Sequence, residues 1–435
     1  MNVLLTASGP PRHSGKRSIL VSLAEQFIQR PSLTLTQLAA ITPPEHTITV
    51  VDENNGQVID FKKNYDVVAI SSFTKYAFRA YEIADAFRVK GSTTIIGGYH
   101  ASALPDEAKQ HADAVVIGEA EEIWPSVLND YEHGRLKPLY RQETPVDPCL
   151  IPPAKYYVRG KKITAGNVQA SRGCPFQCEF CSVGMVEGHR FRARPIDNVI
   201  EEIKALPTSF FSFNDSSLTI DPGYTKDLFR AMRGLGKRFR CLGNINALYE
   251  DEDLIRLSKQ AGCEAWHIGF ESILQDSLDS VKKKNSIRLY TSGIKKIKQH
   301  GVGVKGLFIF GFDNDTRSIF SDTYKAVQEW NLDGADFSIL TPYPGTPLFT
   351  RLEQEGRILT KDWSLYNLGN VVFTPRYMTP QELYEGTRTI AHAFHSWPSL
   401  FRMTLRNDAF DLPGVINKFI GNLWDTKIMI KEQGF

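Results

Sequence analysis

The chain has 435 residues, and its 51 Lys and Arg residues nearly balance its 49 Asp and Glu residues, which leaves a formal net charge of +2. This balance argues against nucleic acid or an anionic membrane as a partner. No run of about 18 apolar residues predicts a membrane span, and the start MNVLLTASGPPRHSGK lacks the order of a signal peptide. We therefore expect a cytoplasmic protein of two or three domains.

Short apolar runs alternate with helical patterns over residues 1–140. The helical patterns include Ala77–Val89 and Asp106–His111. Such alternation predicts a Rossmann-like α/β domain with a parallel, doubly wound sheet. The predicted strands are Asn2–Ala7, Thr47–Val51, Val67–Ser71, Thr93–Ile96 and Ala114–Ile117.

The carboxyl ends of these strands are rich in Gly and Ser, and open α/β sheets bind ligands at that edge. Glycine lets a large ligand approach the backbone because it has no Cβ, although the same glycines also serve in ordinary tight turns. The candidate ligand-binding residues are Ser71, Ser72, Gly97, Gly98, Tyr99, Gly118 and Glu119.

The loop after the first strand resembles a phosphate-binding P-loop only superficially. Between Gly9 and Gly15-Lys16 the spacing is one residue too long, and Arg17 stands where Ser or Thr should bind magnesium. Arg12, Lys16 and Arg17 are better interpreted as a basic loop facing a phosphate-bearing ligand, or as a solvated turn.

Residues 141–165 form the connection to the next domain. Pro145, Pro148, Pro152 and Pro153 interrupt regular structure there. The core that follows spans residues 166–375 and resumes the alternation of strands and helices, which predicts a parallel barrel or partial barrel. Its predicted strands are Ser209–Phe213, Arg240–Ile245, Ala265–Gly269, Val304–Phe310 and Ala335–Leu340, and its predicted helices include Ile196–Leu206, Tyr224–Leu235, Asp251–Gln260 and Ser286–His300.

Three cysteines, Cys174, Cys178 and Cys181, lie within eight residues in the order C-x-x-x-C-x-x-C. Thiolates on one loop can hold three irons of a cubane cluster and leave the fourth iron open. Structural zinc normally needs four ligands, often as two spaced pairs, and no second pair follows. A disulfide is less favoured still in a cytosolic chain with an odd cluster of thiols.

Arg172-Gly173 before the first cysteine and Phe180 before the last complete a motif that resembles the signature of the radical S-adenosylmethionine (SAM) enzymes. That resemblance implies a (β/α)6 partial barrel and a 4Fe-4S cluster whose open iron chelates SAM. It also implies a reducing partner such as flavodoxin or ferredoxin.

The same resemblance assigns candidate SAM contacts to three strand ends. Asp215 falls where the family places groups that meet the SAM amine, although Asp also favours N-caps and turns. Glu271 and Ser272 would meet the ribose, and Gly311 the adenine, although an apolar strand ending in Gly occurs in any barrel.

The runs Ile95–Ala101 and Ala112–Glu121 look like the cobalamin-binding domain found ahead of many radical SAM cores. In that family these strand-end loops border the corrin or its nucleotide tail. The D-x-H-x-x-G motif that supplies a cobalt ligand elsewhere is absent around His13, so His100 is not assigned as a cobalt ligand.

The segment Leu340–Phe349 is similar to a P-x-P-G-T-P-L segment of cobalamin-dependent members. Its prolines fix φ, so it is a stiff candidate wall of the active site. Within it, Tyr343 either faces the substrate as a catalytic residue or packs. Residues 376–435 are expected to form a small, mainly helical domain with Thr379 as an N-cap. Their recurring aromatic residues are more often core than a substrate slot: Tyr384, Phe394, Trp397, Phe401, Phe410, Phe419 and Trp424.

The resemblance implies that a 5′-deoxyadenosyl radical removes hydrogen from an unactivated sp3 carbon and that methylcobalamin then donates a methyl group. The substrate is open among a small molecule, a peptide or protein residue, and a natural-product, pigment or lipid scaffold. A non-methylating cyclisation, rearrangement or carbon–carbon coupling is the alternative. A methylthiotransferase is disfavoured because residues 1–140 contain no Cys, and a sensor without turnover lies outside these enzyme classes.

Overall fold

The computed structural model describes residues 1–10, 31–155, 163 and 165–396. The predicted basic loop at Arg12, Lys16 and Arg17 and the aromatic residues from Trp397 onward lie outside the described residues. The chain divides into two compact units. One holds the described parts of Met1–Pro175, Cys181–Phe239 and Pro344–Thr346, and the other those of Phe176–Phe180, Arg240–Tyr343 and Pro347–Phe435.

The first sheet is six-stranded and parallel, in the order β2-β1-β3-β4-β5-β6. Its central strands are nearly continuous apolar runs because both faces are covered by helices, as in doubly wound sheets. The strands are β1 (Asn2–Ala7), β2 (Thr47–Asp52), β3 (Val67–Ser71), β4 (Thr93–Gly97), β5 (Ala114–Ile117) and β6 (Leu139–Arg141).

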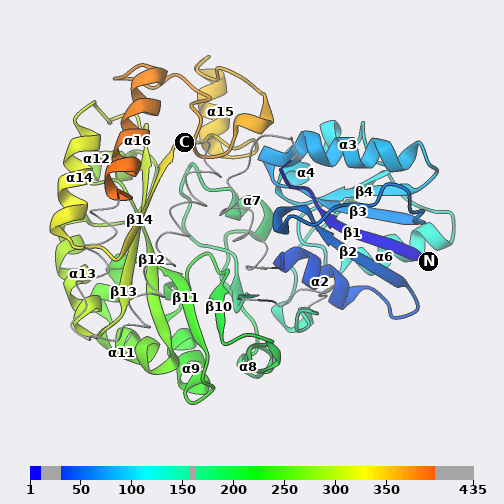
Figure 1. Ribbon diagram of the computed structural model, residues 1–435, viewed down its shortest axis with the longest axis horizontal. Coiled ribbons are helices and arrows are strands. Elements are labelled where there is room, and N and C mark those ends of the chain that lie inside the picture. The colour runs from blue at the N-terminus through cyan, green and yellow to red at the C-terminus, as the bar shows by residue number, and fades with distance from the viewer. Residues whose placement is uncertain (11–30, 156–162, 164, 397–435) are drawn as a thin grey trace. The chain divides into compact units, whose positions relative to one another are not determined.

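Helices pack on both faces of this sheet. Alternate strand residues, among them Val3, Leu5 and Val116, form one core with Leu35 of α2 and Trp124 of α6. On the opposite face, α3 packs on β3 and β4, and Figure 1 shows α3 and α2 on either side of the strands. The helices are α2 (Leu33–Ile41), α3 (Ala77–Arg88), α4 (Tyr99–Ala103), α5 (Pro105–Ala108) and α6 (Ile123–Glu132).

The second sheet has the strand order β14-β13-β12-β11-β10-β7. This count confirms the predicted partial barrel of six strands. In β12 to β14 the side chains alternate between fully buried and partly exposed, which is the period-two pattern of strands. The strands are β7 (Gly166–Val168), β10 (Phe210–Phe213), β11 (Arg238–Gly243), β12 (Cys263–Glu271), β13 (Gly303–Phe310) and β14 (Gly334–Ile339).

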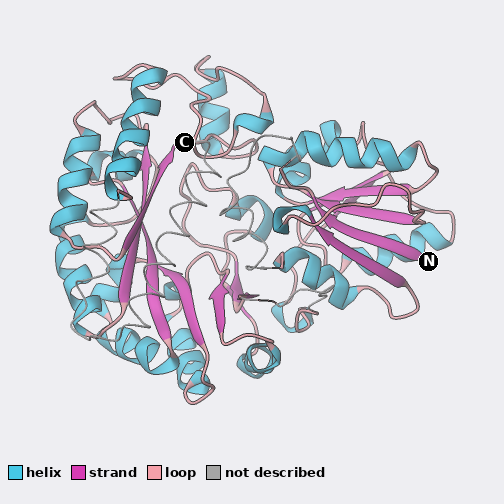
Figure 2. Ribbon diagram, viewed as in Figure 1, coloured by secondary structure: helices cyan, strands magenta, loops and turns pink. Residues whose placement is uncertain are grey.

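Helices follow the strands of this region, and Figure 2 shows them along the outer side of β12 to β14. A short antiparallel pair, β8 (Ser171–Arg172) and β9 (Arg192–Ala193), flanks the cysteine loop. The helices are α7 (Val183–Glu187), α8 (Ile196–Ala205), α9 (Pro222–Met232), α10 (Ile245–Glu250), α11 (Glu252–Ala261), α12 (Gln275–Ser280), α13 (Tyr290–Gln299), α14 (Ile319–Glu329), α15 (Pro347–Gln354) and α16 (Pro380–Phe394).

Many of the predicted bounds differ from the observed ones by one or more residues, and three of these differences are informative. The predicted helix Asp106–His111 is instead α5, which starts at Pro105 because proline fits the first turn of a helix. The first sheet continues past residue 140, because β6 ends at Arg141. The predicted strand Arg240–Ile245 begins at Arg238 and ends at Gly243, since Asn244 caps helix α10.

The predicted start of the last described helix is confirmed. The Thr379 side chain accepts a hydrogen bond from the Glu382 amide, and the Glu382 carboxylate accepts one from the Thr379 amide. This reciprocal pair is a capping box, and Pro380 occupies the first helical position. The residue types alone were sufficient to predict this start.

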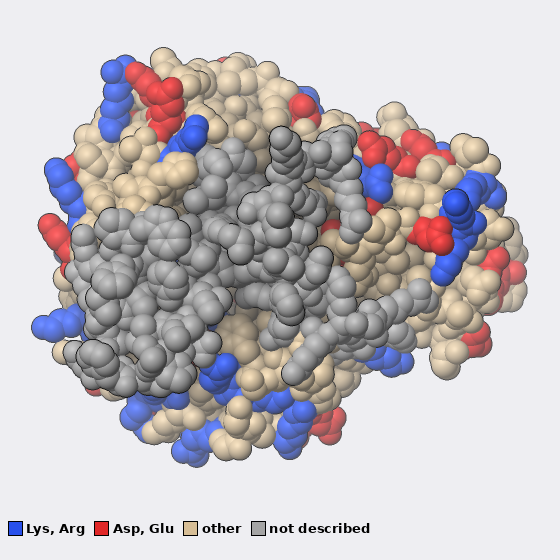
Figure 3. All heavy atoms as spheres, viewed as in Figure 1, with Lys and Arg blue, Asp and Glu red and all other residues tan. Residues whose placement is uncertain are grey.

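On the face drawn in Figure 3, Lys and Arg side chains and Asp and Glu side chains are interspersed among the described residues. This distribution agrees with the nearly balanced charge of the chain. Among the helices that the structure describes, none combines the length and the apolar character needed to cross a membrane.

Candidate functional site

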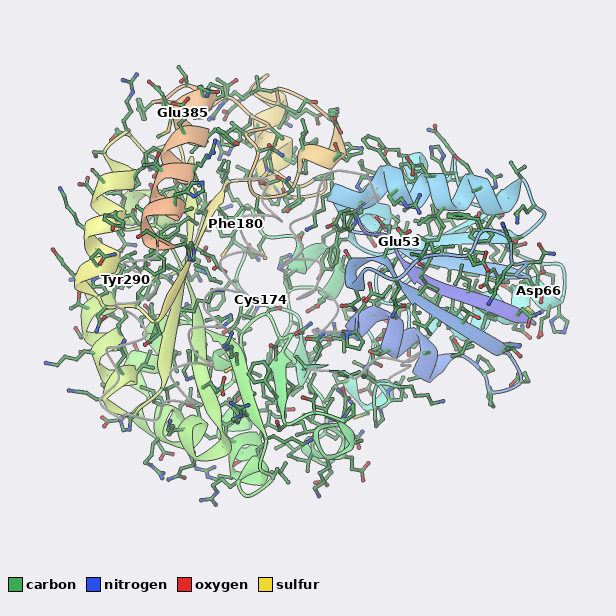
Figure 4. All side chains as sticks on the ribbon, viewed as in Figure 1. Glu53, Asp66, Cys174, Phe180, Tyr290 and Glu385 are labelled. Carbon is green, nitrogen blue, oxygen red and sulfur yellow. The ribbon has the colours of Figure 1, made fainter. Side chains whose placement is uncertain are left out.

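The cysteine loop leaves β8 at Arg172, and Figure 4 labels Cys174 on it. Gly173 has φ +76°, and a Cβ there would overlap the carbonyl of Arg190, so the loop entry requires glycine. The Cys174 amide donates to the Gly188 carbonyl at 3.2 Å. These contacts fix the point at which the first thiol enters the loop.

All six cysteines carry free thiols, and Cys174, Cys178 and Cys181 are each partly exposed. Cys178 Sγ lies 3.9 Å from the carbonyl oxygen of Lys282. Three half-exposed thiols on one irregular loop match the thiolate donors that iron–sulfur clusters take. The chemistry of the residues present therefore fits a 4Fe-4S cluster, and the assignment of these three cysteines as its ligands stays a prediction.

Glu179 lies between two of the cysteines, and its amide, its carbonyl and its carboxylate all have partners. Its amide donates to the Val281 carbonyl at 3.0 Å, and its carbonyl accepts from the Leu348 amide at 2.9 Å. Its carboxylate lies 3.2 Å from Lys282 Nζ and 3.5 Å from Arg351 Nε. The cysteine motif treats this position as a spacer, so the motif could not predict this anchor.

Asp215 follows β10 and is 2% exposed. Its carboxylate accepts hydrogen bonds from the amides of Ala170 and Ser171 and from the Ser171 hydroxyl. The alternative that it caps a local turn is wrong, because Ser217 and Asp221 provide the nearby caps. Burial raises its pKa to about 7, while these hydrogen bonds oppose the rise. Asp215 thus holds the segment that leads into the cysteine loop.

At the carboxyl edge of the first sheet, the loops after β3 and β4 touch. The Ser72 amide donates to the Gly97 carbonyl at 3.1 Å, and Ser8 Oγ donates to Ser72 Oγ at 2.9 Å. Gly98 has φ +98°, and a Cβ there would lie 2.8 Å from the Ser72 carbonyl oxygen and 3.2 Å from Ser71 Oγ. Gly98 is therefore required by the packing of two backbones, whereas Gly97 has only ordinary contacts.

An aromatic pair stands at the same edge. The rings of Phe73 and Tyr99 stack with centroids 5.9 Å apart, and Phe73 is 56% exposed. Tyr99 begins α4, which packs against α7 just after the cysteine loop. Burial raises the pKa of Tyr99, and the charges of Glu187 and Cys181 add to the rise. Tyr99 therefore lies close to both the sheet edge and the end of the cysteine loop.

A buried ionic network joins the loop after β5 to the segment before Cys174. Arg172 lies 3.0 Å from Glu119 and 2.5 Å from Glu121, and Arg192 lies 2.9 Å from Glu119. All four side chains are 10% exposed or less. Opposite charges this close and this well buried favour the charged forms of both groups. Burial alone would raise the pKa of Glu121, but the charge and hydrogen bond of Arg172 lower it overall.

Residues 168–327 match the family described as the Radical SAM superfamily, and residues 45–128 match the B12 binding domain. The chain is 34% identical over 373 residues to bacteriochlorophyllide d C-12(1)-methyltransferase of Chlorobaculum tepidum, covering 81% of this chain and 80% of that protein. It belongs to the cobalamin-dependent radical SAM methyltransferases. The cofactors of such an enzyme are a 4Fe-4S cluster, SAM and cobalamin.

Two further comparisons agree with the assignment. Bacteriochlorophyllide d C-8(2)-methyltransferase of the same organism is 31% identical over 397 residues, covering 86% of this chain and 88% of that protein. The solved structure of the radical SAM methyltransferase TsrM from Kitasatospora setae, with cobalamin and a [4Fe-4S] cluster bound, gives a TM-score of 0.65. That structure is 15% identical, covering 98% of this chain and 90% of its own, and therefore shows a shared fold.

The glycines at the edge of the first sheet are compatible with the close approach of cobalamin in this methyltransferase, and the contacts with cobalamin there stay predictions. Gly118 has φ +89°, and its amide donates to Ser102 Oγ at 3.0 Å. This hydrogen bond ties the loop after β5 to α4. His100 is buried, with Nε2 3.0 Å from the Tyr81 hydroxyl and 3.4 Å from Glu107. These contacts, on the face that carries α3 and α5, give His100 a role within the domain core. Glu119 pairs with two arginines and accepts from the Val146 amide, and its predicted contact with cobalamin stays a prediction.

The predicted SAM contacts of the methyltransferase on β12 and β13 lie within one unit. Glu271 has φ +62° and pairs with Lys283 Nζ at 2.8 Å. Ser272 Oγ accepts from the Leu274 amide at 3.1 Å. The Gly311 amide donates to Asp315 at 2.9 Å. Their contacts with SAM stay predictions, and so does the catalytic role of Tyr343.

Sequence reasoning missed Asp315 and Gly345. Burial raises the pKa of Asp315 to about 6, while the Gly311 and Phe312 amides and the Ser277 hydroxyl all donate to it. Gly345, next to the segment with Tyr343, has φ +81°, and a Cβ there would overlap Met185 of α7. Only the glycine and proline content of the segment hinted at such a close approach.

Proposed function

We propose that this enzyme transfers a methyl group to an unactivated sp3 carbon in a side chain of a chlorophyllide-type tetrapyrrole. Support for the substrate class comes from the names of the two bacteriochlorophyllide methyltransferases, each more than 30% identical to this chain. When bound, the cluster and SAM supply a hydrogen-abstracting radical, and cobalamin carries the methyl group, with a second SAM as the methyl source.

The observation that carries the proposal is the nearness of two features within one compact unit. Glu119, at the edge of the first sheet, pairs with Arg172, and α4, which begins with Tyr99, packs against α7 just after Cys181. A radical formed on a substrate must meet the methyl donor before it reacts with anything else. An arrangement that keeps the two cofactor-binding loops adjacent serves that need.

The protein groups would bind, orient and exclude water. Cys174, Cys178 and Cys181 hold the cluster, and Asp215 fixes the backbone that leads into their loop. Gly98 and Gly118 have positive φ and carry no Cβ. The strand-end loops therefore leave room at the sheet edge for a large planar cofactor. An acidic or flavin-type electron donor such as flavodoxin or ferredoxin would supply reducing equivalents.

The test is an anaerobic incubation of cluster-reconstituted protein with hydroxocobalamin, a chemical reductant, methyl-deuterated SAM and bacteriochlorophyllide d. The expected products, by mass spectrometry, are 5′-deoxyadenosine, S-adenosylhomocysteine and a pigment with one CD3 group in place of hydrogen. Cys178→Ala should abolish all three products.

Two other outcomes have definite meanings. Deoxyadenosine with an altered but unlabelled pigment would replace methylation by a cyclisation or coupling reaction. Deoxyadenosine and S-adenosylhomocysteine without any change of the pigment would remove tetrapyrroles as the substrate class and leave the methyltransferase assignment standing.

A further inference from the structure

We propose that the network of Arg172, Arg192, Glu119 and Glu121 couples the two cofactor sites, so that cobalamin and the 4Fe-4S cluster each strengthen the binding of the other. This inference rests on the cobalamin placement in the proposed function, and it is independent of the substrate. It assigns a positioning role to the four side chains of this network.

The network has one end in each cofactor loop. Glu119 and Glu121 directly follow Gly118 at the carboxyl end of β5, where cobalamin is expected. Arg172 is separated from Cys174 only by Gly173, whose amide donates to Glu187 at 3.0 Å. A displacement of either loop therefore reaches the other through one shared side chain, Arg172.

The contacts of Arg172 hold its guanidinium group in one orientation. Its NH1 and NH2 groups bond to different carboxylates, Glu119 at 3.0 Å and Glu121 at 2.5 Å. Its Nε donates to Gln169 at 2.8 Å, so the whole guanidinium fork is engaged. A fixed fork with several charge-assisted bonds holds one orientation, which a flexible ammonium does not.

The charge count makes the network intolerant of partial disruption. Glu119 and Glu121 supply two carboxylates, and Arg172 and Arg192 supply two guanidinium groups, so the charges balance only when all four are present. The Glu119 carboxylate serves both arginines and also accepts from the Val146 amide at 2.8 Å. Breaking one buried pair leaves an uncompensated charge, so the loops are expected to keep or lose this arrangement together.

Coupling between two ligands is reciprocal by thermodynamic necessity, and typical couplings change affinity by about five- to 150-fold. The cluster-loaded protein should therefore bind cobalamin at least about fivefold more tightly than the cluster-free protein. Cobalamin should, by the same factor, protect the cluster against removal by a chelator.

The test titrates hydroxocobalamin into the full chain with and without the reconstituted cluster and follows the quenching of intrinsic fluorescence. Glu121→Gln removes one charged partner of Arg172 and keeps the size of the side chain. It should bring the ratio of the two affinities close to one while the iron content stays at the wild-type level. Glu122→Gln is the matched control, because Glu122 is the next residue, is exposed and bonds to Gln142.

A second variant covers the possibility that Glu121→Gln does not hold a cluster. Arg172→Lys keeps the positive charge but loses the fork, and should lower the affinity ratio with iron retained. The proposal is overturned if the wild-type ratio is one, or if Arg172→Lys with full iron content keeps the wild-type ratio. Failure of cobalamin to bind the wild-type protein in either state would instead overturn the placement of cobalamin in the proposed function.

Discussion

The Ser171 hydroxyl and the Ser171 amide both donate to the same carboxylate oxygen of Asp215, the hydroxyl at 2.6 Å. A residue of the strand before the cysteine loop is thus fixed from the end of β10, more than 40 residues later. The other Asp215 oxygen accepts from the Ala170 amide at 3.1 Å.

This arrangement predicts a pH dependence of stability. Burial raises the pKa of Asp215 from 3.8 to about 7, so between these values the folded state keeps a proton that the unfolded state has released. The stabilisation is complete below pH 4 and is lost as pH rises to 7, by about 4 kcal/mol in total. The free energy of unfolding of cluster-free protein, measured by urea at several pH values, should fall over this range.

Asp215→Asn serves as the comparison, because an amide does not titrate there. The variant should lose this pH dependence and about 1–3 kcal/mol of stability at low pH, since its NH2 group would face another donor. An unchanged slope in Asp215→Asn would show that a different group is responsible.

Gly98→Ala should destabilise the first domain and weaken cobalamin binding. The new Cβ would lie 2.8 Å from the Ser72 carbonyl, and a φ of +98° costs a non-glycine residue about 1–3 kcal/mol. Thermal unfolding and equilibrium dialysis with hydroxocobalamin measure the two effects. The matched control is Gly97→Ala, whose Cβ meets only Val116 at 3.6 Å. If Gly97→Ala lost cobalamin while staying stable, Gly97 would be the glycine that the cofactor approaches.

Phe73→Ala should weaken cobalamin binding about two- to tenfold and lower the stability by no more than about 1.5 kcal/mol, the value of its stack on Tyr99. Its ring is 56% exposed and stacks on Tyr99 at the sheet edge, and an aromatic stacking partner contributes about 0.5–1.5 kcal/mol. Fluorescence titration measures the affinity, and Phe73→Trp should restore it. Val89→Ala, at the other end of α3, removes an exposed apolar side chain far along the helix and should have no effect.

Glu179→Gln should accelerate the loss of iron from the cluster to a chelator about fivefold or more. The substitution keeps the backbone contacts but removes the charge that pairs with Lys282 and Arg351, a change of about 1 kcal/mol. Glu355→Gln is the control, because Glu355 also pairs with Arg351 but lies outside the cysteine loop. Equal rates in the two variants would remove the special role of Glu179.

The sequence was informative wherever the signal is local. Strands β1, β3 and β5 were predicted with their observed bounds because each is a short apolar run ending at Gly or Ser. Strand β6 was missed because it has three residues and only Tyr140 is buried. The three cysteines could be singled out as cluster ligands because their spacing matches the family motif, and this assignment stays a prediction.

The rest of the site depends on contacts between distant residues. Glu119 meets Arg172 and Arg192 across more than 50 positions, and no local pattern encodes such a pair. Gly98 was singled out as a cofactor contact, which stays a prediction, and its close approach to Ser72 could not be recognised from the sequence. Glu179 was hidden because it occupies a spacer position of the motif.

The Arg172 and Arg192 contacts have a consequence for chimeric enzymes. A cobalamin-binding module exchanged at residue 140 would leave both guanidinium groups behind, buried among whatever replaces Glu119 and Glu121. Grafts from relatives should therefore carry the two arginines, or the hairpin of β8 and β9, along with the donor module. A suitable exchange point in this chain is therefore one that keeps Arg172 and Arg192 together with Glu119 and Glu121, and residue 140 does not.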